Sequence, residues 1–143
     1  MGINTLYGTT QAGIGLLRAG ESPQAPYLQR AARTVMSFQN ADGGFGESTL
    51  SYLDAEHRGR GASTPTQTAW VLEFLCQMNL HQTDTIPAAV NYLLETRDES
   101  ESWRDGSVVG TGHPGILYME YPVYPKTFPV MALAKYALAG ADA

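Results

Sequence analysis

Residues 59–70, which read GRGASTPTQTAW, contain the clearest structural signal in this chain of 143 residues. Glycines lead up to a helix start, and Thr64 is placed to cap the free amide groups of the first helical turn. Pro65 follows at the first helical position, where its missing N–H costs nothing. A largely apolar run over residues 70–76 continues the segment. This pattern predicts a helix over residues 64–79 that begins at a defined capping residue.

Helical periodicity extends from this segment over most of the chain. Apolar spacing and start signals predict four further helices, over residues 5–19, 26–39, 86–97 and 126–139. Two long irregular segments, residues 40–63 and 98–125, lie between them, and loops of that length in a compact domain are usually functional. We therefore expect one all-α domain over residues 1–143.

The predicted helices follow an internal repeat. Ala31-Ala32 recurs as Ala88-Ala89, and Thr10-Gln11 recurs as Thr66-Gln67 at nearly the same interval. Each unit would consist of a helix, a turn, a second helix and a loop that ends in an aromatic residue. Repeats with two helices each are typical of solenoids or toroids of paired helices. Five helices without polar outer caps do not close a toroid, so we expect part of one.

The two loops of this repeat suggest a packing role. The first begins QNADGGFGE at Gln39, and Gly43 and Gly44 permit tight backbone with positive φ. The Gln39 amide can bond to backbone groups at the end of the next helix, while Phe45 packs over the loop. The second copy, residues 96–103, has lost the glutamine and the glycines but keeps Trp103 in the aromatic position. We interpret all five residues as structural.

Composition excludes several classes of function. The net charge is −5 and no basic cluster is present, which argues against nucleic acid as a partner. Cys76 is the single cysteine, so neither a disulfide framework nor a cysteine-based zinc site is possible, and a buried thiol is expected. No signal-like segment and no apolar run long enough to span a membrane occurs. We expect a cytoplasmic protein, with peripheral attachment to a membrane left open.

Three stretches together resemble the squalene–hopene and oxidosqualene cyclases. GRGASTPTQTAW is similar to the stretch before the last long helices of that family, and QNADGGFGE resembles its repeated glutamine-to-tryptophan (QW) motif. The third is residues 110–115, GTGHPG, followed by Tyr118, Tyr121 and Tyr124. Matches extend from about Ile3 to Tyr136. The resemblance implies about half of an α6/α6 barrel of terpenoid cyclase type.

The resemblance also implies a reaction. These cyclases protonate a terminal alkene of squalene or a related linear polyprenoid and guide a cationic ring cascade in an aromatic-lined cavity. They take the acid from an Asp-x-Asp-Asp motif, which is absent here. The chain therefore resembles the C-terminal portion only, and its partner would be the missing N-terminal cyclase portion, fused or separate. No metal and no organic cofactor is implied.

Individual site residues follow from the same resemblance. Tyr7 matches a tyrosine that supports the catalytic acid through hydrogen bonds, although a packed core position is an equal alternative. Tyr121 and Tyr124 match aromatic residues at or just behind the cavity wall, where ring faces stabilise cations. His113 and Leu117 stand where the family has two cavity aromatics. Their presence predicts early termination or an altered product, with His113 either a terminating base or a hydrogen-bonding turn residue.

Other classes of paired-helix protein fit less well. Protein prenyltransferase β-subunits need a zinc site of Asp, Cys and His, and Cys76 has no partner at ligand spacing. Sugar-cleaving enzymes on paired-helix barrels need two opposed carboxylates, which the loops do not offer. The remaining alternative is a non-catalytic helical-repeat binding or scaffold module derived from a cyclase, with residues 118–128 as its contact surface.

Overall fold

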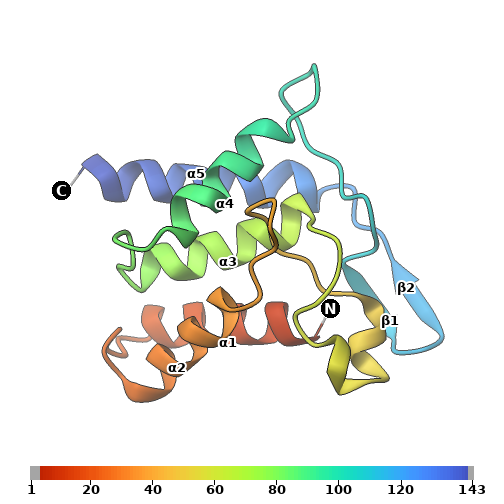
Figure 1. The fold of residues 1–143 in the computed structure, drawn as a ribbon, viewed down its shortest axis with the longest axis horizontal. Coiled ribbons are helices and arrows are strands. Elements are labelled where there is room, and N and C mark those ends of the chain that lie inside the picture. Colours follow the sequence, from red (N-terminus) through yellow and green to blue (C-terminus); the bar gives the residue numbers. More distant parts are fainter. Residues whose placement is uncertain (1–3, 142–143) are drawn as a thin grey trace.

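The computed structural model describes residues 4–141, and this part of the chain is mainly helical (Figure 1). Two short 3₁₀ segments and one β-hairpin accompany the α-helices. In chain order the elements are α1 (Asn4–Arg18), α2 (Pro26–Met36), η1 (Thr49–Tyr52), η2 (Ala55–His57), α3 (Pro65–Gln77), α4 (Thr85–Glu95), β1 (Gly110–His113), β2 (Leu117–Met119) and α5 (Tyr124–Ala141).

The helices form two layers. Helices α1, α3 and α5 lie side by side and run in the same direction, with α3 in the middle. Helices α2 and α4 run the opposite way, α2 packed against α1 and α4 against α3. Each pair of consecutive helices therefore places one member in each layer. The layer of α1, α3 and α5 is here called the inner layer, and that of α2 and α4 the outer layer. Within the described residues, no helix is long and apolar enough to cross a membrane.

Helix α3 is the centre of the core. All its residues from Pro65 to Cys76 are buried, because α1, α4 and α5 all pack around it. A largely apolar helix needs such neighbours on every side to be stable in water. Its predicted start is confirmed, since the Thr64 hydroxyl accepts a hydrogen bond from the Gln67 amide at 3.1 Å and Pro65 occupies the first turn. Burial also raises the pKa of the Cys76 thiol to about 11.

Both predicted loops contain short regular structure that the sequence pattern did not reveal. Segments η1 and η2 lie within residues 40–63, and the antiparallel pair β1–β2 lies within residues 98–125. The hairpin requires glycine at position 110, because a Cβ atom there would lie 2.4 Å from the Tyr121 ring. Gly115 provides the turn with a φ of 77°. The fold is therefore helix-rich but not purely α-helical.

Helix ends and the repeat also differ in detail from the prediction. Helix α2 ends at Met36 rather than at Gln39, whose amide instead closes a turn onto the Met36 carbonyl at 3.2 Å. The Thr-Gln repeat is not a structural one, since α1 begins at residue 4 and α3 at residue 65. Thr66-Gln67 therefore occupies a first turn and Thr10-Gln11 a later one. The alanine repeat is structural, because Ala32 and Ala89 are both buried on outer-layer helices.

Candidate functional site

The first QW-type loop joins two consecutive repeats. The Gln39 side chain donates hydrogen bonds to the Gly43 carbonyl at 2.8 Å and to the Thr85 carbonyl, at the start of α4, at 2.9 Å. The loop lies close against α4, since a Cβ atom on Gly43 would lie 2.6 Å from the Ala88 carbonyl oxygen. Phe45 is fully buried beneath the loop.

The two glycines of this loop serve different purposes. Gly43 has a φ of 83°, in the left-handed region that favours glycine. Gly44 has no positive φ, so the expectation of such backbone at both positions is wrong. Space is what Gly44 requires, because a Cβ atom there would lie 2.6 Å from the Ser63 Cβ and 2.9 Å from the Tyr92 ring.

The second QW-type loop, which begins with residues 96–103, also packs against α4, although this stretch lacks the glutamine and the glycines of the first. Its Trp103 is 5% exposed and donates its indole N–H to the Leu93 carbonyl, in the last turn of α4, at 2.7 Å. Asp98 shapes the turn by accepting hydrogen bonds from Ser100 and from the Ser102 amide, and these bonds lower the pKa of the Asp98 carboxyl. This loop thus stabilises its turn through carboxylate hydrogen bonds to nearby amides, where the first loop relies on glycines.

Carboxylates from both loops bond to the starts of inner-layer helices, and sequence reasoning missed them. Glu47 is 3% exposed and accepts hydrogen bonds from the Thr5 and Leu6 amides of α1, at distances between 2.7 and 3.1 Å. Asp105 accepts from the amide and the hydroxyl of Thr66 in α3, at 3.0 and 2.7 Å. Neither bond could be foreseen locally, because each joins residues about forty positions apart.

Aromatic rings from α1, α3 and the start of α5 form one cluster, here called the ring cluster. Trp70 lies at its centre, with ring centroids 5.0 Å from Tyr7, 5.7 Å from Phe128 and 6.2 Å from Tyr124, all edge-on. Tyr121 stacks on Tyr124 at 4.5 Å. The structure therefore brings together three of the predicted site tyrosines, Tyr7, Tyr121 and Tyr124.

Two members of the ring cluster, Trp70 and Phe128, were not among the predicted site residues. Phe128 lies one helical turn after Tyr124, with ring centroids 5.1 Å apart, and this spacing is the signal that could have found it. Partial burial is the main reason that the pKa of Tyr124 is raised. The cluster thus offers ring faces and edges rather than ionised groups.

The hairpin carries the other two predicted site residues, outside the ring cluster. His113 is exposed, and its Nδ1 lies 3.1 Å from the Pro114 carbonyl oxygen. Leu117, its register partner on β2, is 51% exposed. Tyr121 connects the two regions, since it follows β2, packs over Gly110 and stacks within the ring cluster.

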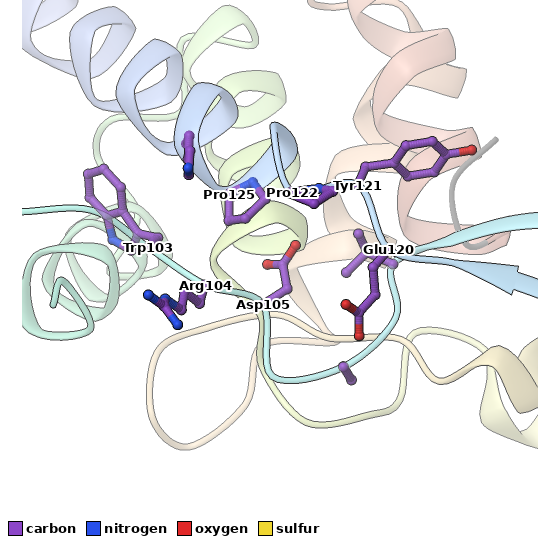
Figure 2. A pocket seen from close by; sticks show the side chains of 10 residues that line it. Trp103, Arg104, Asp105, Glu120, Tyr121, Pro122 and Pro125 are labelled. Atoms are coloured by element: carbon purple, nitrogen blue, oxygen red, sulfur yellow. The ribbon is translucent and has the colours of Figure 1, made fainter.

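A cavity of about 320 Å³ adjoins Tyr121 on the side of the second QW-type loop. Figure 2 shows two carboxylates, Asp105 and Glu120, among its lining side chains. Burial raises the pKa of Asp105, the Thr66 hydrogen bonds oppose this shift, and Glu120 adds to it. Since Asp105 is already committed to Thr66, the cavity offers no free pair of carboxylates for acid–base chemistry.

Across residues 4–141, no group of three or more His, Cys, Asp or Glu side chains is placed to hold an ion. What the structure does present is a paired-helix repeat whose inner layer carries an aromatic cluster at the hairpin end. This arrangement defines a helical-repeat protein whose candidate site is a cluster of aromatic side chains.

Comparison with known proteins identifies the family. The sequence model of the squalene-hopene cyclase C-terminal domain matches residues 1–138, and the chain belongs to this family. It is 37% identical to a squalene–hopene cyclase of Bradyrhizobium diazoefficiens over 136 residues, and 40% identical to that of Alicyclobacillus acidocaldarius over 135 residues. Each match covers 94% of this chain and 21% of the relative. A squalene-tetrahymanol cyclase of Tetrahymena thermophila is 44% identical over 101 residues, or 66% of this chain and 15% of that protein. The chain thus spans about a fifth of the length of the squalene–hopene cyclases it matches.

Proposed function

We propose that this chain forms part of the wall of a cavity in which a linear polyprene such as squalene is cyclised by a proton-initiated carbocation cascade. The ring cluster is the observation that carries the proposal. A cation over a ring face is stabilised by roughly 2 kcal/mol when water is excluded. Tyr7, Tyr121 and Tyr124 are only partly buried, so each has surface that a bound polyprene could contact.

The layer arrangement supports a toroid of which this chain supplies about half. Among the inner-layer helices of residues 4–141, α3 lies in the middle and packs extensively against both α1 and α5, which form the two ends of the row. Large apolar side chains remain exposed on α5, namely Val130 at 53%, Met131 at 46% and Leu138 at 67%. Further helices of an N-terminal cyclase portion, fused or separate, would cover these side chains and close the barrel.

The proposed roles follow the matched positions. Tyr7 would support the acid through hydrogen bonds, and that acid would come from the N-terminal portion, because this chain has no Asp-x-Asp-Asp motif. Tyr121 and Tyr124 would face the cations of the cascade. His113 and Leu117 would weaken stabilisation of the late cations, since neither offers the ring face of phenylalanine. Peripheral contact with a membrane would give access to so apolar a substrate.

A fusion protein tests this function directly. The matched C-terminal fifth of the Alicyclobacillus cyclase is replaced by this full chain, and the purified fusion is incubated with squalene. We expect cyclised products by gas chromatography and mass spectrometry, and none from the same relative lacking that fifth. A fusion that folds cooperatively but leaves squalene unchanged would contradict the proposal and favour a binding module.

A further inference from the structure

Trp70 connects the two outer helices of the inner layer. It lies on α3 and is 0% exposed, so it cannot touch a molecule in the cavity. Its indole edge reaches Tyr7 on α1 and both Tyr124 and Phe128 on α5. Because α3 separates α1 from α5, this indole is a packing link between tyrosines that come from opposite sides.

The N–H group of the Trp70 indole bears on why tryptophan occupies this position. Its indole N–H is buried and has no hydrogen-bond partner among the described residues. Leaving a buried donor without a partner costs about 1–3 kcal/mol. Phenylalanine would avoid that cost but has a shorter side chain with a single ring. The ring contacts with Tyr7, Tyr124 and Phe128 use the width of the indole.

The two tyrosines depend on Trp70 to different degrees. Tyr124 also stacks on Tyr121 at 4.5 Å and contacts Phe128 at 5.1 Å. Tyr7 has one ring contact within the described part of the chain, the indole of Trp70 at 5.0 Å. Loss of the indole would leave Tyr124 packed on two rings and would remove the one ring contact that Tyr7 makes within residues 4–141.

We infer that Trp70 is a positioning residue that holds the Tyr7 ring in its working orientation. The inference rests on the proposed cyclase function, in which Tyr7 supports the acid. A hydroxyl that must donate or accept a hydrogen bond in the initial proton transfer has to be held at a defined place. The buried indole holds the ring at a centroid distance of 5.0 Å, while Tyr7 keeps part of its surface exposed.

The fusion protein allows Trp70 to be tested against a matched core residue. Phe74 lies one turn later on α3, is also 0% exposed, and packs its ring against Gly13 instead of the tyrosines. We expect Trp70→Leu to lower kcat about tenfold with KM within about twofold, and Trp70→Phe to give an intermediate value. Phe74→Leu should also lower the melting temperature but change kcat by less than about twofold.

A double-mutant cycle with Tyr7 makes the test specific. If Trp70 acts through Tyr7, Tyr7→Phe should slow the parent fusion but add little to Trp70→Leu. Equal losses of kcat in Trp70→Leu and Phe74→Leu, or the same effect of Tyr7→Phe in both backgrounds, would overturn the inference alone. A parent fusion with no cyclase activity would instead overturn the proposed function and this inference with it.

Discussion

Glu47 and Asp105 make the same kind of contact one repeat apart. Glu47 lies two residues after the loop aromatic Phe45, and Asp105 lies two residues after Trp103. Each carboxylate accepts a backbone hydrogen bond from the first turn of an inner-layer helix, α1 for Glu47 and α3 for Asp105. A negative charge at a helix N-terminus is favourable. Each two-helix unit is thus closed by a carboxylate from the loop that follows it.

The first prediction concerns the Glu47 contact. Glu47→Ala should lower the free energy of unfolding by about 2–3 kcal/mol, because it leaves the Thr5 and Leu6 amides without their carboxylate acceptor. Asp54→Ala is a suitable control, since Asp54 caps the short segment η2 at an exposed position and should cost less than about 1 kcal/mol. Urea denaturation of both variants measures the difference. Equal losses would refute the closing role of Glu47.

The second prediction concerns pH and Asp105. Burial raises the pKa of this carboxyl in the folded chain, so the folded state binds the proton more tightly than the unfolded state. Its stabilising contribution is therefore complete below the unfolded pKa, near 3.8, and is lost as the pH rises through the folded pKa. Asp105→Asn removes this titration while keeping an acceptor for the Thr66 amide. The unfolding free energy of the parent minus that of the variant should fall as the pH rises above the unfolded pKa. A difference that grows over this range would contradict the raised pKa.

A pair of glycines provides the third prediction. Gly43 and Gly20 both have positive φ, 83° and 97°, but a Cβ atom would clash with the Ala88 carbonyl oxygen only at Gly43. Gly20→Ala should cost about 1–2 kcal/mol from backbone strain alone. Gly43→Ala adds a contact of 2.6 Å with backbone that cannot move easily, so its loss should be clearly larger. Thermal unfolding of the two variants compares them, and a similar melting temperature for both would show that the loop yields to the methyl group.

The fourth prediction concerns the product of the proposed reaction. His113→Phe combined with Leu117→Phe in the fusion protein would restore two ring faces on the hairpin. We expect the share of incompletely cyclised or early-terminated products to fall, because the late cations would regain stabilisation of up to about 2 kcal/mol per ring. Product analysis by gas chromatography measures this share. An unchanged product profile would exclude these two positions from control of the cascade.

Local signals in the sequence located the helices well. Thr64 and Pro65 define the start of α3 through contacts within a single turn, and the pattern alone could predict it. The hairpin could not be predicted in the same way. Its strands have four and three residues, and Gly110 and Gly112 in β1 give no alternation of apolar side chains. Gly110 also packs closely against the Tyr121 ring, which lies outside the strands, and no local pattern indicates that contact.

The candidate site was predictable only in part, for a similar reason. Motif positions picked out Tyr7, Tyr121 and Tyr124, but Trp70 reads in sequence as one more apolar residue of a buried helix. Its importance comes from contacts with α1 and α5, which depend on how the layers pack. The spacing of residues within α3 alone cannot predict these contacts between helices.

The central place of α3 has a consequence for synthesis of the chain. Helix α3 ends at Gln77, whereas α5, which covers one of its sides, begins only at Tyr124. At roughly 5–20 residues per second, the ribosome needs several seconds to make the intervening segment and then α5. During that time the nascent chain presents an apolar helix with an uncovered side, a feature that molecular chaperones bind. Newly made chains should therefore depend on chaperones mainly in the interval before α5 emerges.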